Sequence, residues 1–123
     1  MTLIWIGLGG ALGAILRFLS VQTALRLMGP GFPWGTVFVN VAGSLLMGLA
    51  AALIVERTGA GRASYFLMAG CLGGFTTFSA FSLDAMALLE SGRLGAAFGY
   101  IAGSVLFSIL ALIAGLWLGR GLA

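Results

Sequence analysis

Four long apolar segments dominate the sequence and leave few choices of fold. They run from about Leu3 to Leu27, Trp34 to Val55, Ser64 to Leu89 and Leu94 to Gly119, and short polar turns separate them. A helix needs about 20 apolar residues to cross the hydrocarbon core of a bilayer, so each segment is long enough for one span. We therefore predict an all-α membrane protein in which residues 1–123 form a single bundle of four transmembrane helices.

Charged and reactive side chains are too scarce for most other classes of protein. Only 7% of the residues are charged, against about 25% in soluble proteins. The arginines are scattered singly, which argues against nucleic acid as a partner. Glu56, Asp84 and Glu90 lie at or near the ends of spans, there is no histidine, and Cys71 is the single cysteine. No nucleophile is placed with a base, so we expect no enzyme, and we interpret Cys71 as a packing residue.

The arginines of the loops give little preference for one orientation in the membrane. Arg57, Arg62 and Arg120 lie on the side of the two termini, whereas Arg26 and Arg93 lie on the other side. Orientation follows the excess of Lys and Arg in short loops, and this excess is small. Either other signals orient the chain, or it inserts both ways and forms an antiparallel dimer. Charge alone leaves both alternatives open.

Glycines at four-residue spacing provide faces on which helices can approach closely. The pairs and runs are Gly9 and Gly13, Gly70 and Gly74, Gly95, Gly99 and Gly103, and Gly115 and Gly119. The run from Gly95 to Gly103 is the least expected by chance.

Two stripes of polar side chains lie within the apolar segments. They are Thr36, Asn40 and Ser44 in the second segment, and Tyr100, Ser104 and Ser108 in the fourth. Residues four apart share one helix face. The amide of Asn40 is costly to bury without partners, so we expect it to face another helix or a polar pathway. Hydrogen bonding between helices and the lining of a pathway both remain open as explanations.

Arg17 lies about halfway along the first segment. Its long stem can carry the guanidinium to the interface. Alternatively, the side chain faces a wet vestibule, where its charge would attract anions. Asp84, of the same or of a second chain, is a candidate partner.

The stretch GGFTTFSAFS, residues 73–82, combines weak helix formers with hydroxyl side chains in the middle of a span. Backbone polar groups inside a membrane must be satisfied by protein or by a water-filled cavity. We therefore predict a helix break in the third span, of the kind that holds ions in transport proteins. The alternative is a glycine-rich packing contact without a break. Phe75, Phe78 and Phe81 are spaced by three, and the positive edges of such rings can face a small anion.

Three motifs resemble those of one membrane protein family. The stretches GGALGAILRF around Arg17, GTVFVNVAGSLLMG from Gly35 to Gly48, and GGFTTFSAF closely resemble the small bacterial fluoride channels of the Fluc (CrcB-type) family. The resemblance covers the first three spans in order. It implies a dual-topology, antiparallel homodimer in the lipid of the bacterial cytoplasmic (inner) membrane. Two antiparallel pores would let fluoride leave the cytoplasm passively and so limit its toxicity.

The resemblance also implies roles for individual residues. A structural sodium ion, which is not transported, would lie at the dimer centre on backbone carbonyls of Gly73 and Thr76 from both subunits. Arg17 would lie at the vestibule. The fluoride pore would be lined by the rings and polar groups of Phe78, Phe81, Asn40, Thr77, Ser79, Tyr100, Ser104 and Ser108. Ala80 departs from the family pattern, which usually has threonine or serine there.

Two other functions remain as alternatives. The first is a small secondary transporter that exports anions by alternating access. The second is a subunit for membrane assembly that transports nothing. No carboxylate lies in the middle of a span to load a proton, which argues against an exporter that is coupled to cations.

Overall fold

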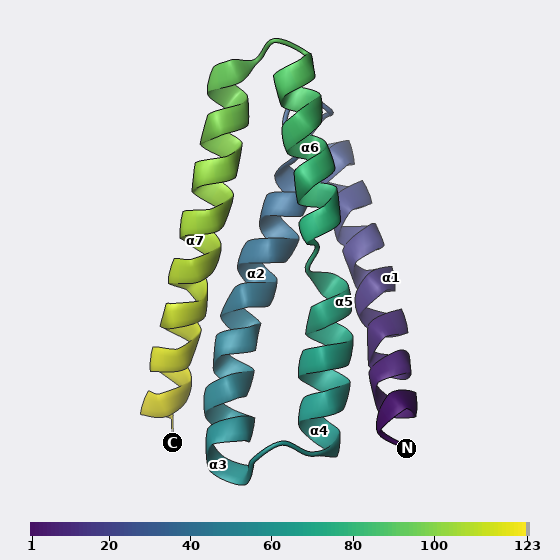
Figure 1. The fold of residues 1–123 in the computed structure, drawn as a ribbon, viewed down its shortest axis with the longest axis vertical. Coiled ribbons are helices and arrows are strands. Elements are labelled where there is room, and N and C mark those ends of the chain that lie inside the picture. The colour runs from purple at the N-terminus through teal and green to yellow at the C-terminus, as the bar shows by residue number, and fades with distance from the viewer. Residues whose placement is uncertain (123) are drawn as a thin grey trace.

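The computed structural model describes residues 1–122 and contains four long helices that run roughly side by side (Figure 1). The first is α1 (Thr2–Met28) and the last is α7 (Leu94–Gly121). The second is continuous from α2 (Trp34–Ala50) through the π-helix η1 (Ala51–Val55) to α3 (Glu56–Thr58). The third consists of α4 (Arg62–Ser64), the π-helix η2 (Tyr65–Leu72), α5 (Gly73–Phe75) and α6 (Phe78–Glu90).

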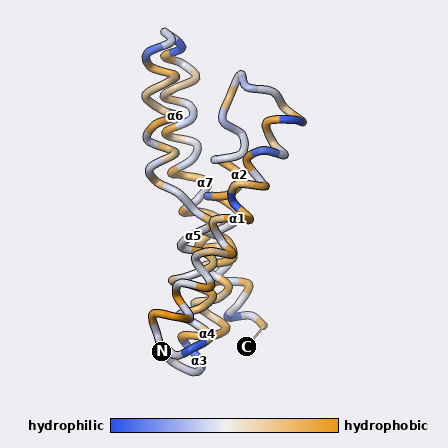
Figure 2. Tube along the Cα trace, turned by 90° about the vertical axis from the view of Figure 1, so that its right-hand side faces the viewer, coloured by the Kyte–Doolittle hydropathy of each residue, from blue (hydrophilic) through white to orange (hydrophobic). Residues whose placement is uncertain are grey.

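The prediction of four membrane spans is confirmed, because all four helices are long and apolar enough to cross a bilayer. The N-terminus and the end of α7 lie at the same end of the bundle as the α3–α4 connection, and the other two turns lie at the opposite end (Figure 1). Hydrophilic residues gather mainly at these two ends (Figure 2). The chain is therefore a multi-pass membrane protein whose polar turns lie outside the apolar layer.

The third long helix contains two residues with extended backbone. Thr76 has φ −82° and ψ 158°, and Thr77 has φ −151° and ψ 124°. The hydroxyl of Thr77 accepts a hydrogen bond from the N–H of Ala80 at 3.1 Å, which is the usual cap at the start of a helix. Gly73 and Gly74 themselves lie in α5, so the extended conformation falls on the threonines and not on the glycines.

Backbone contacts at glycine positions fix the third long helix against α1. A Cβ atom on Gly9 would overlap the carbonyl oxygen of Phe66, and one on Gly13 would overlap that of Cys71. From the other side, a Cβ on Gly74 would lie 2.7 Å from the carbonyl oxygen of Gly10. No side chain fits at these positions, so α1 packs on η2 and α5 with the backbones in contact, as small residues in membrane helices allow.

A second set of glycine contacts joins α2 and η1 to α7. A Cβ on Gly48 would lie 3.1 Å from the Cα of Gly115, and one on Gly119 would lie 2.6 Å from the Cβ of Ala52. The run from Gly95 to Gly103 differs, since Cβ atoms on Gly95 and Gly99 would meet nothing within 4 Å. The other glycine pairs therefore pack helices of the same chain closely together, whereas the run from Gly95 to Gly103 lies on an open face of α7.

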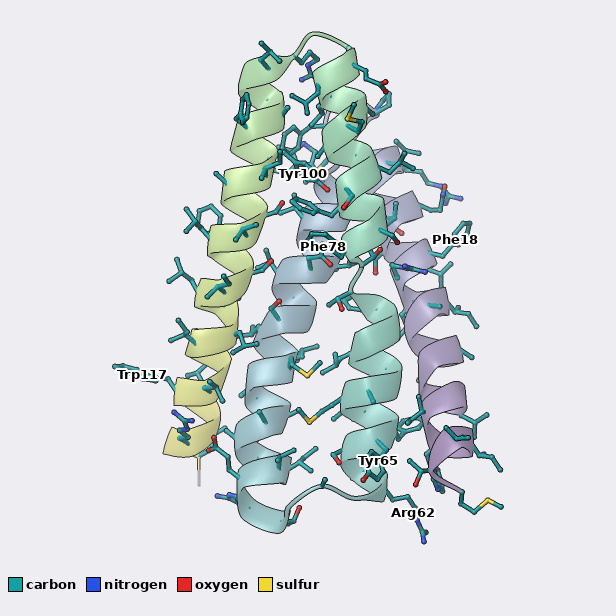
Figure 3. All side chains as sticks on the ribbon, in the orientation of Figure 1. Phe18, Arg62, Tyr65, Phe78, Tyr100 and Trp117 are labelled. Carbon is teal, nitrogen blue, oxygen red and sulfur yellow. The ribbon has the colours of Figure 1, made fainter. Side chains whose placement is uncertain are left out.

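Side chains, rather than backbones, join α6 to α7. A buried cluster between them contains Phe81, Ala85, Leu88, Ala97 and Tyr100. Figure 3 shows Tyr100 in the space between α6 and α7, whereas Phe18 and Trp117 point away from the bundle. These outward apolar side chains are what a lipid-facing surface requires.

Candidate functional site

A groove of about 300 Å³ lies between α2, α7 and the point where α5 passes into α6. Thr76 and Thr77, the two residues with extended backbone (hereafter the extended pair), form part of its wall. The polar side chains that line it come from three of the four long helices. Its lining includes Asn40, Ser44, Thr76, Thr77, Phe78, Phe81, Ser104 and Ser108. Six of the residues that were predicted to line a pore are thus brought together: Asn40, Thr77, Phe78, Phe81, Ser104 and Ser108.

Ser104 and Ser108 place hydroxyl groups in this groove without protein partners. Their Oγ atoms are buried and have no hydrogen-bond partner among residues 1–122. The whole side chain of Ser104 is nearly inaccessible, with 5% of its surface exposed. An unpaired buried hydroxyl costs about 1–3 kcal/mol. The arrangement leaves two hydroxyl donors, one turn apart on α7, without a protein acceptor.

Phe78 and Phe81 form the aromatic part of the lining, at the start of α6. Their ring centroids are 5.5 Å apart and the rings are tilted by 52°. Phe78 is 76% exposed, whereas Phe81 is buried and packs on Tyr100 with a centroid distance of 5.1 Å. One ring is therefore free to meet another molecule, and the other is held by the core.

Asn40 is bonded to the backbone of the extended pair from the middle of α2. Its Oδ1 accepts a hydrogen bond from the N–H of Thr77 at 2.7 Å, and its Nδ2 donates to the carbonyl oxygen of Thr77 at 3.0 Å. One turn further along α2, a Cβ on Gly43 would overlap the methyl group of Thr76. The sequence indicated that Asn40 needs a partner, and the structure identifies this partner as the main chain of the third long helix.

Tyr100 does not line the groove, although it shares a helix face with Ser104 and Ser108. It is 1% exposed, and its hydroxyl donates to Oδ2 of Asp84 at 3.1 Å. The hydroxyl of Thr36 donates to the same oxygen at 2.7 Å. Asp84 also lines a second cavity of about 430 Å³ that is bounded by α1, the turn before α2, and α6.

The sequence did not predict that Thr36, Asp84 and Tyr100 form one hydrogen-bonded cluster. In the sequence-based predictions, Asp84 appeared only as a candidate partner of Arg17. Among residues 1–122, Arg17 and Asp84 do not form an ion pair. The ion pair that is present joins Arg120 to Glu56, with a distance of 2.7 Å between Nη2 and Oε2. The signal that could have found the cluster is an acid just inside a span, at the depth of a threonine and a tyrosine on neighbouring spans.

The remaining predicted residues lie at the edges of the groove or away from it. Arg17 is half-buried on α1 and is not among the lining residues. Ser79 is exposed, with its hydroxyl 3.3 Å from that of Thr77. Gly73 is exposed at the start of α5, and the hydroxyl of Thr76 donates to the carbonyl of Leu72 at 3.0 Å.

The sequence is similar to one family of proteins over nearly its whole length. The family described as "CrcB-like protein, Camphor Resistance (CrcB)" matches residues 4–116. A protein of Paracoccus denitrificans (strain Pd 1222) is 53% identical over 121 residues, which cover 98% of this chain and 96% of that protein.

Two further relatives are nearly as similar. One from Rhizobium meliloti (strain 1021) is 52% identical, with 95% of this chain and 94% of the relative covered. One from Mesorhizobium japonicum is 48% identical, with 98% and 97% covered. All three relatives bear the name "Fluoride-specific ion channel FluC", which agrees with the prediction that the chain is not an enzyme. The chain therefore belongs to the CrcB-like family, because the family matches residues 4–116 and the sequence identity to its relatives extends over nearly the whole chain.

Proposed function

We propose that the chain is the subunit of a fluoride-selective channel that lets fluoride leave the cytoplasm passively across the bacterial inner membrane. The observation that carries this proposal is the pair of buried, unpartnered hydroxyls of Ser104 and Ser108 in the groove. The relatives named as fluoride-specific ion channels support the choice of anion.

The chemistry of the groove suits a small, strongly hydrated anion. Fluoride loses its water only if other donors replace it, and a hydroxyl is a donor that rotates to suit its acceptor. The edge of the exposed Phe78 ring carries partial positive charge and can supply a further contact. No acidic side chain is among the lining residues, so none repels an anion inside the groove.

The open groove also supports assembly of two copies of the chain. Polar lining that faces an apolar bilayer is costly unless protein or water covers it. A second copy, inserted in the opposite orientation, would cover the groove and would bring the two extended Thr76–Thr77 segments together near the middle of the bilayer. In this arrangement the two extended residues are the helix break of the third span, and each dimer contains two antiparallel pores.

The backbone near the extended pair has the chemistry of a sodium site. The N–H of Thr77 donates to Asn40, so it is not available to the carbonyl of Gly73, which would be its partner in a continuous helix. Gly73 is exposed. Carbonyl oxygens are suitable ligands for a hard cation, and Gly73 and Thr76 of two copies would supply four. Bound there, the ion would offset the repulsion between the carbonyl oxygens that the two chains direct toward each other.

Purified protein in liposomes tests the proposal. We expect fluoride efflux, followed with a fluoride-selective electrode, to be fast, and chloride efflux to be undetectable under the same gradient. Efflux should proceed without a proton gradient. Flux that requires such a gradient would instead identify an exporter that works by alternating access. A dimer that passes no anion would identify a subunit without a transport role.

A further inference from the structure

We propose that Asn40 and the hydroxyl of Thr77 are positioning residues that keep the carbonyls of Gly73 and Thr76 free of helical hydrogen bonds. The proposal rests on the channel function above and assigns to two side chains the task of shaping the backbone at the helix break. It differs from the role that the family resemblance gives Asn40, which is that of a donor in the pore.

The rule of α-helical hydrogen bonding identifies the two N–H groups that matter. In a continuous helix, the N–H of each residue donates to the carbonyl four residues earlier. The carbonyl of Gly73 would therefore receive the N–H of Thr77, and the carbonyl of Thr76 would receive the N–H of Ala80. In this structure, both of these N–H groups are bonded elsewhere.

Asn40 diverts the first N–H. Its Oδ1 accepts from the N–H of Thr77 at 2.7 Å, which is a short and favourable distance. Its Nδ2 donates to the carbonyl of the same residue at 3.0 Å. These two bonds fix which end of the amide faces the chain, because only the oxygen accepts and only the nitrogen donates. The side chain thus pairs with Thr77 much as a neighbouring strand would.

The hydroxyl of Thr77 diverts the second N–H. It accepts from the N–H of Ala80 at 3.1 Å. Threonine is favoured at this position because the capping residue takes up extended backbone while its oxygen reaches forward. Gly43 leaves room for Thr76 to approach α2, since a Cβ at residue 43 would overlap the methyl group of Thr76. The extended pair is therefore held from α2 and from the start of α6.

The consequence is that the two side chains release the same two carbonyls that the proposed sodium site needs. Without the diversion, the N–H groups of Thr77 and Ala80 would compete with a cation for these oxygens. Residues that orient metal ligands from outside typically change metal affinity by about 10–100-fold when they are replaced. We therefore expect the sodium dependence of the dimer to report on Asn40 and Thr77.

Three variants of α2 separate the positioning role from a role in the pore. Asn40→Ala removes the acceptor for the N–H of Thr77. Asn40→Asp retains this acceptor, loses the Nδ2 donor to the carbonyl of Thr77 and places a negative charge beside the groove. Ser44→Ala is the matched control, because Ser44 lies one turn away, lines the same groove and has no hydrogen bond to residues 76–77 among the described residues.

The measurement is the sodium concentration at which thermal stability of the purified full-length dimer rises, with N-methylglucamine as the replacement cation. In Asn40→Ala, this midpoint should rise by about 10–100-fold. It should not rise in Asn40→Asp, because the acceptor for the N–H of Thr77 is retained and the added negative charge attracts a cation, although that variant should lose fluoride flux. Ser44→Ala should keep the wild-type midpoint.

A second set of variants tests the other side chain without touching α2. Thr77→Val removes the hydroxyl at nearly constant volume and should raise the sodium midpoint, while Thr77→Ser should restore it. Carbon-13 chemical shifts of Thr76 and residue 77 provide a direct check on the backbone. They should be extended in the wild type and should move toward helical values in Asn40→Ala and Thr77→Val.

Two results would overturn the proposal. One is a wild-type sodium midpoint in both Asn40→Ala and Thr77→Val. The other is extended shifts at residues 76 and 77 in both variants. A wild-type protein that passes no fluoride is a different outcome, since it would refute the channel function and leave the backbone shifts to decide whether the two side chains shape the chain.

Discussion

The two parts of the third long helix are packed in different ways, and the extended pair Thr76–Thr77 separates them. On one side, η2 and α5 lie against α1 with backbone atoms in contact at Gly9, Gly13 and Gly74. On the other side, α6 lies against α7 through rings and a carboxylate, with Phe81, Tyr100 and Asp84 at the contact. The same membrane span thus combines contact between backbones with contact between side chains.

The difference between backbone contacts and side-chain contacts indicates where the chain can accommodate a ligand. Backbones in contact leave no room for a rotamer change, so the α1 side behaves as a rigid support. The α6 side retains side chains that end in polar or aromatic groups, and the groove opens there, with the unpartnered hydroxyls of Ser104 and Ser108 on the facing helix. We infer that one half of the span holds the chain in place and that the other half carries the site.

The largest effect should come from breaking the rigid half. Gly13→Leu should destabilise the protein by about 3 kcal/mol or prevent folding, because even its Cβ would overlap the carbonyl oxygen of Cys71. Thermal unfolding in detergent measures the change. Gly7→Leu is the control, since a Cβ there would meet nothing within 4 Å. Equal stability of the two variants would contradict the distinction between the halves.

An intermediate effect should come from the exposed ring of the other half. Phe78→Ile should lower fluoride flux by about tenfold, because an aliphatic side chain has no positive ring edge. Its unfolding temperature should stay near that of wild type, since Phe78 is 76% exposed. Phe98→Ile, on α7 and outside the groove lining, is the control, with 62% exposure.

Phe81→Ile refines this test, because Phe81 packs on Tyr100. It should lower both flux and stability. If both phenylalanine variants keep wild-type flux, the rings have no part in the passage of fluoride.

The smallest loss of stability should come from the hydroxyls without partners. Ser104→Ala and Ser108→Ala should each leave the free energy of unfolding unchanged or raise it by up to about 1–3 kcal/mol, because no protein hydrogen bond is lost and an unpaired buried hydroxyl is removed. Fluoride flux should nevertheless fall.

Thr36→Val provides the contrast for this pair, since its hydroxyl does have a partner, Asp84. It should cost about 1–3 kcal/mol. A serine variant that loses as much stability as Thr36→Val would show that the serine hydroxyl is bonded in the folded chain.

Much of the architecture could be predicted from the sequence. The four spans were expected within three residues of their observed ends, for example Trp34 to Val55 against Trp34–Thr58. Apolar length and turn residues mark such ends locally, so no knowledge of the partner helices is needed. The grouping of Asn40 with Ser104, Ser108 and the phenylalanines around one groove also followed from helical spacing together with the family resemblance.

Other features could not be predicted, because they depend on how each helix is rotated about its axis. Tyr100 shares a helix face with Ser104, yet it turns into the core toward Asp84 and Thr36 instead of lining the groove. The backbone partner of Asn40 lies 37 residues further along the chain, and no local pattern marks it.

The amino-acid sequence by itself determined that this chain is a bundle of four membrane helices, since hydropathy, span length and turn chemistry are local properties. Only the tertiary structure decided which polar groups remain without partners and which are paired. Ser104 and Ser108 keep unbonded hydroxyls while Tyr100 and Asn40 find acceptors and donors. The physical reason is that a hydrogen bond needs two groups within about 3 Å, and only the packing of separate helices sets that distance.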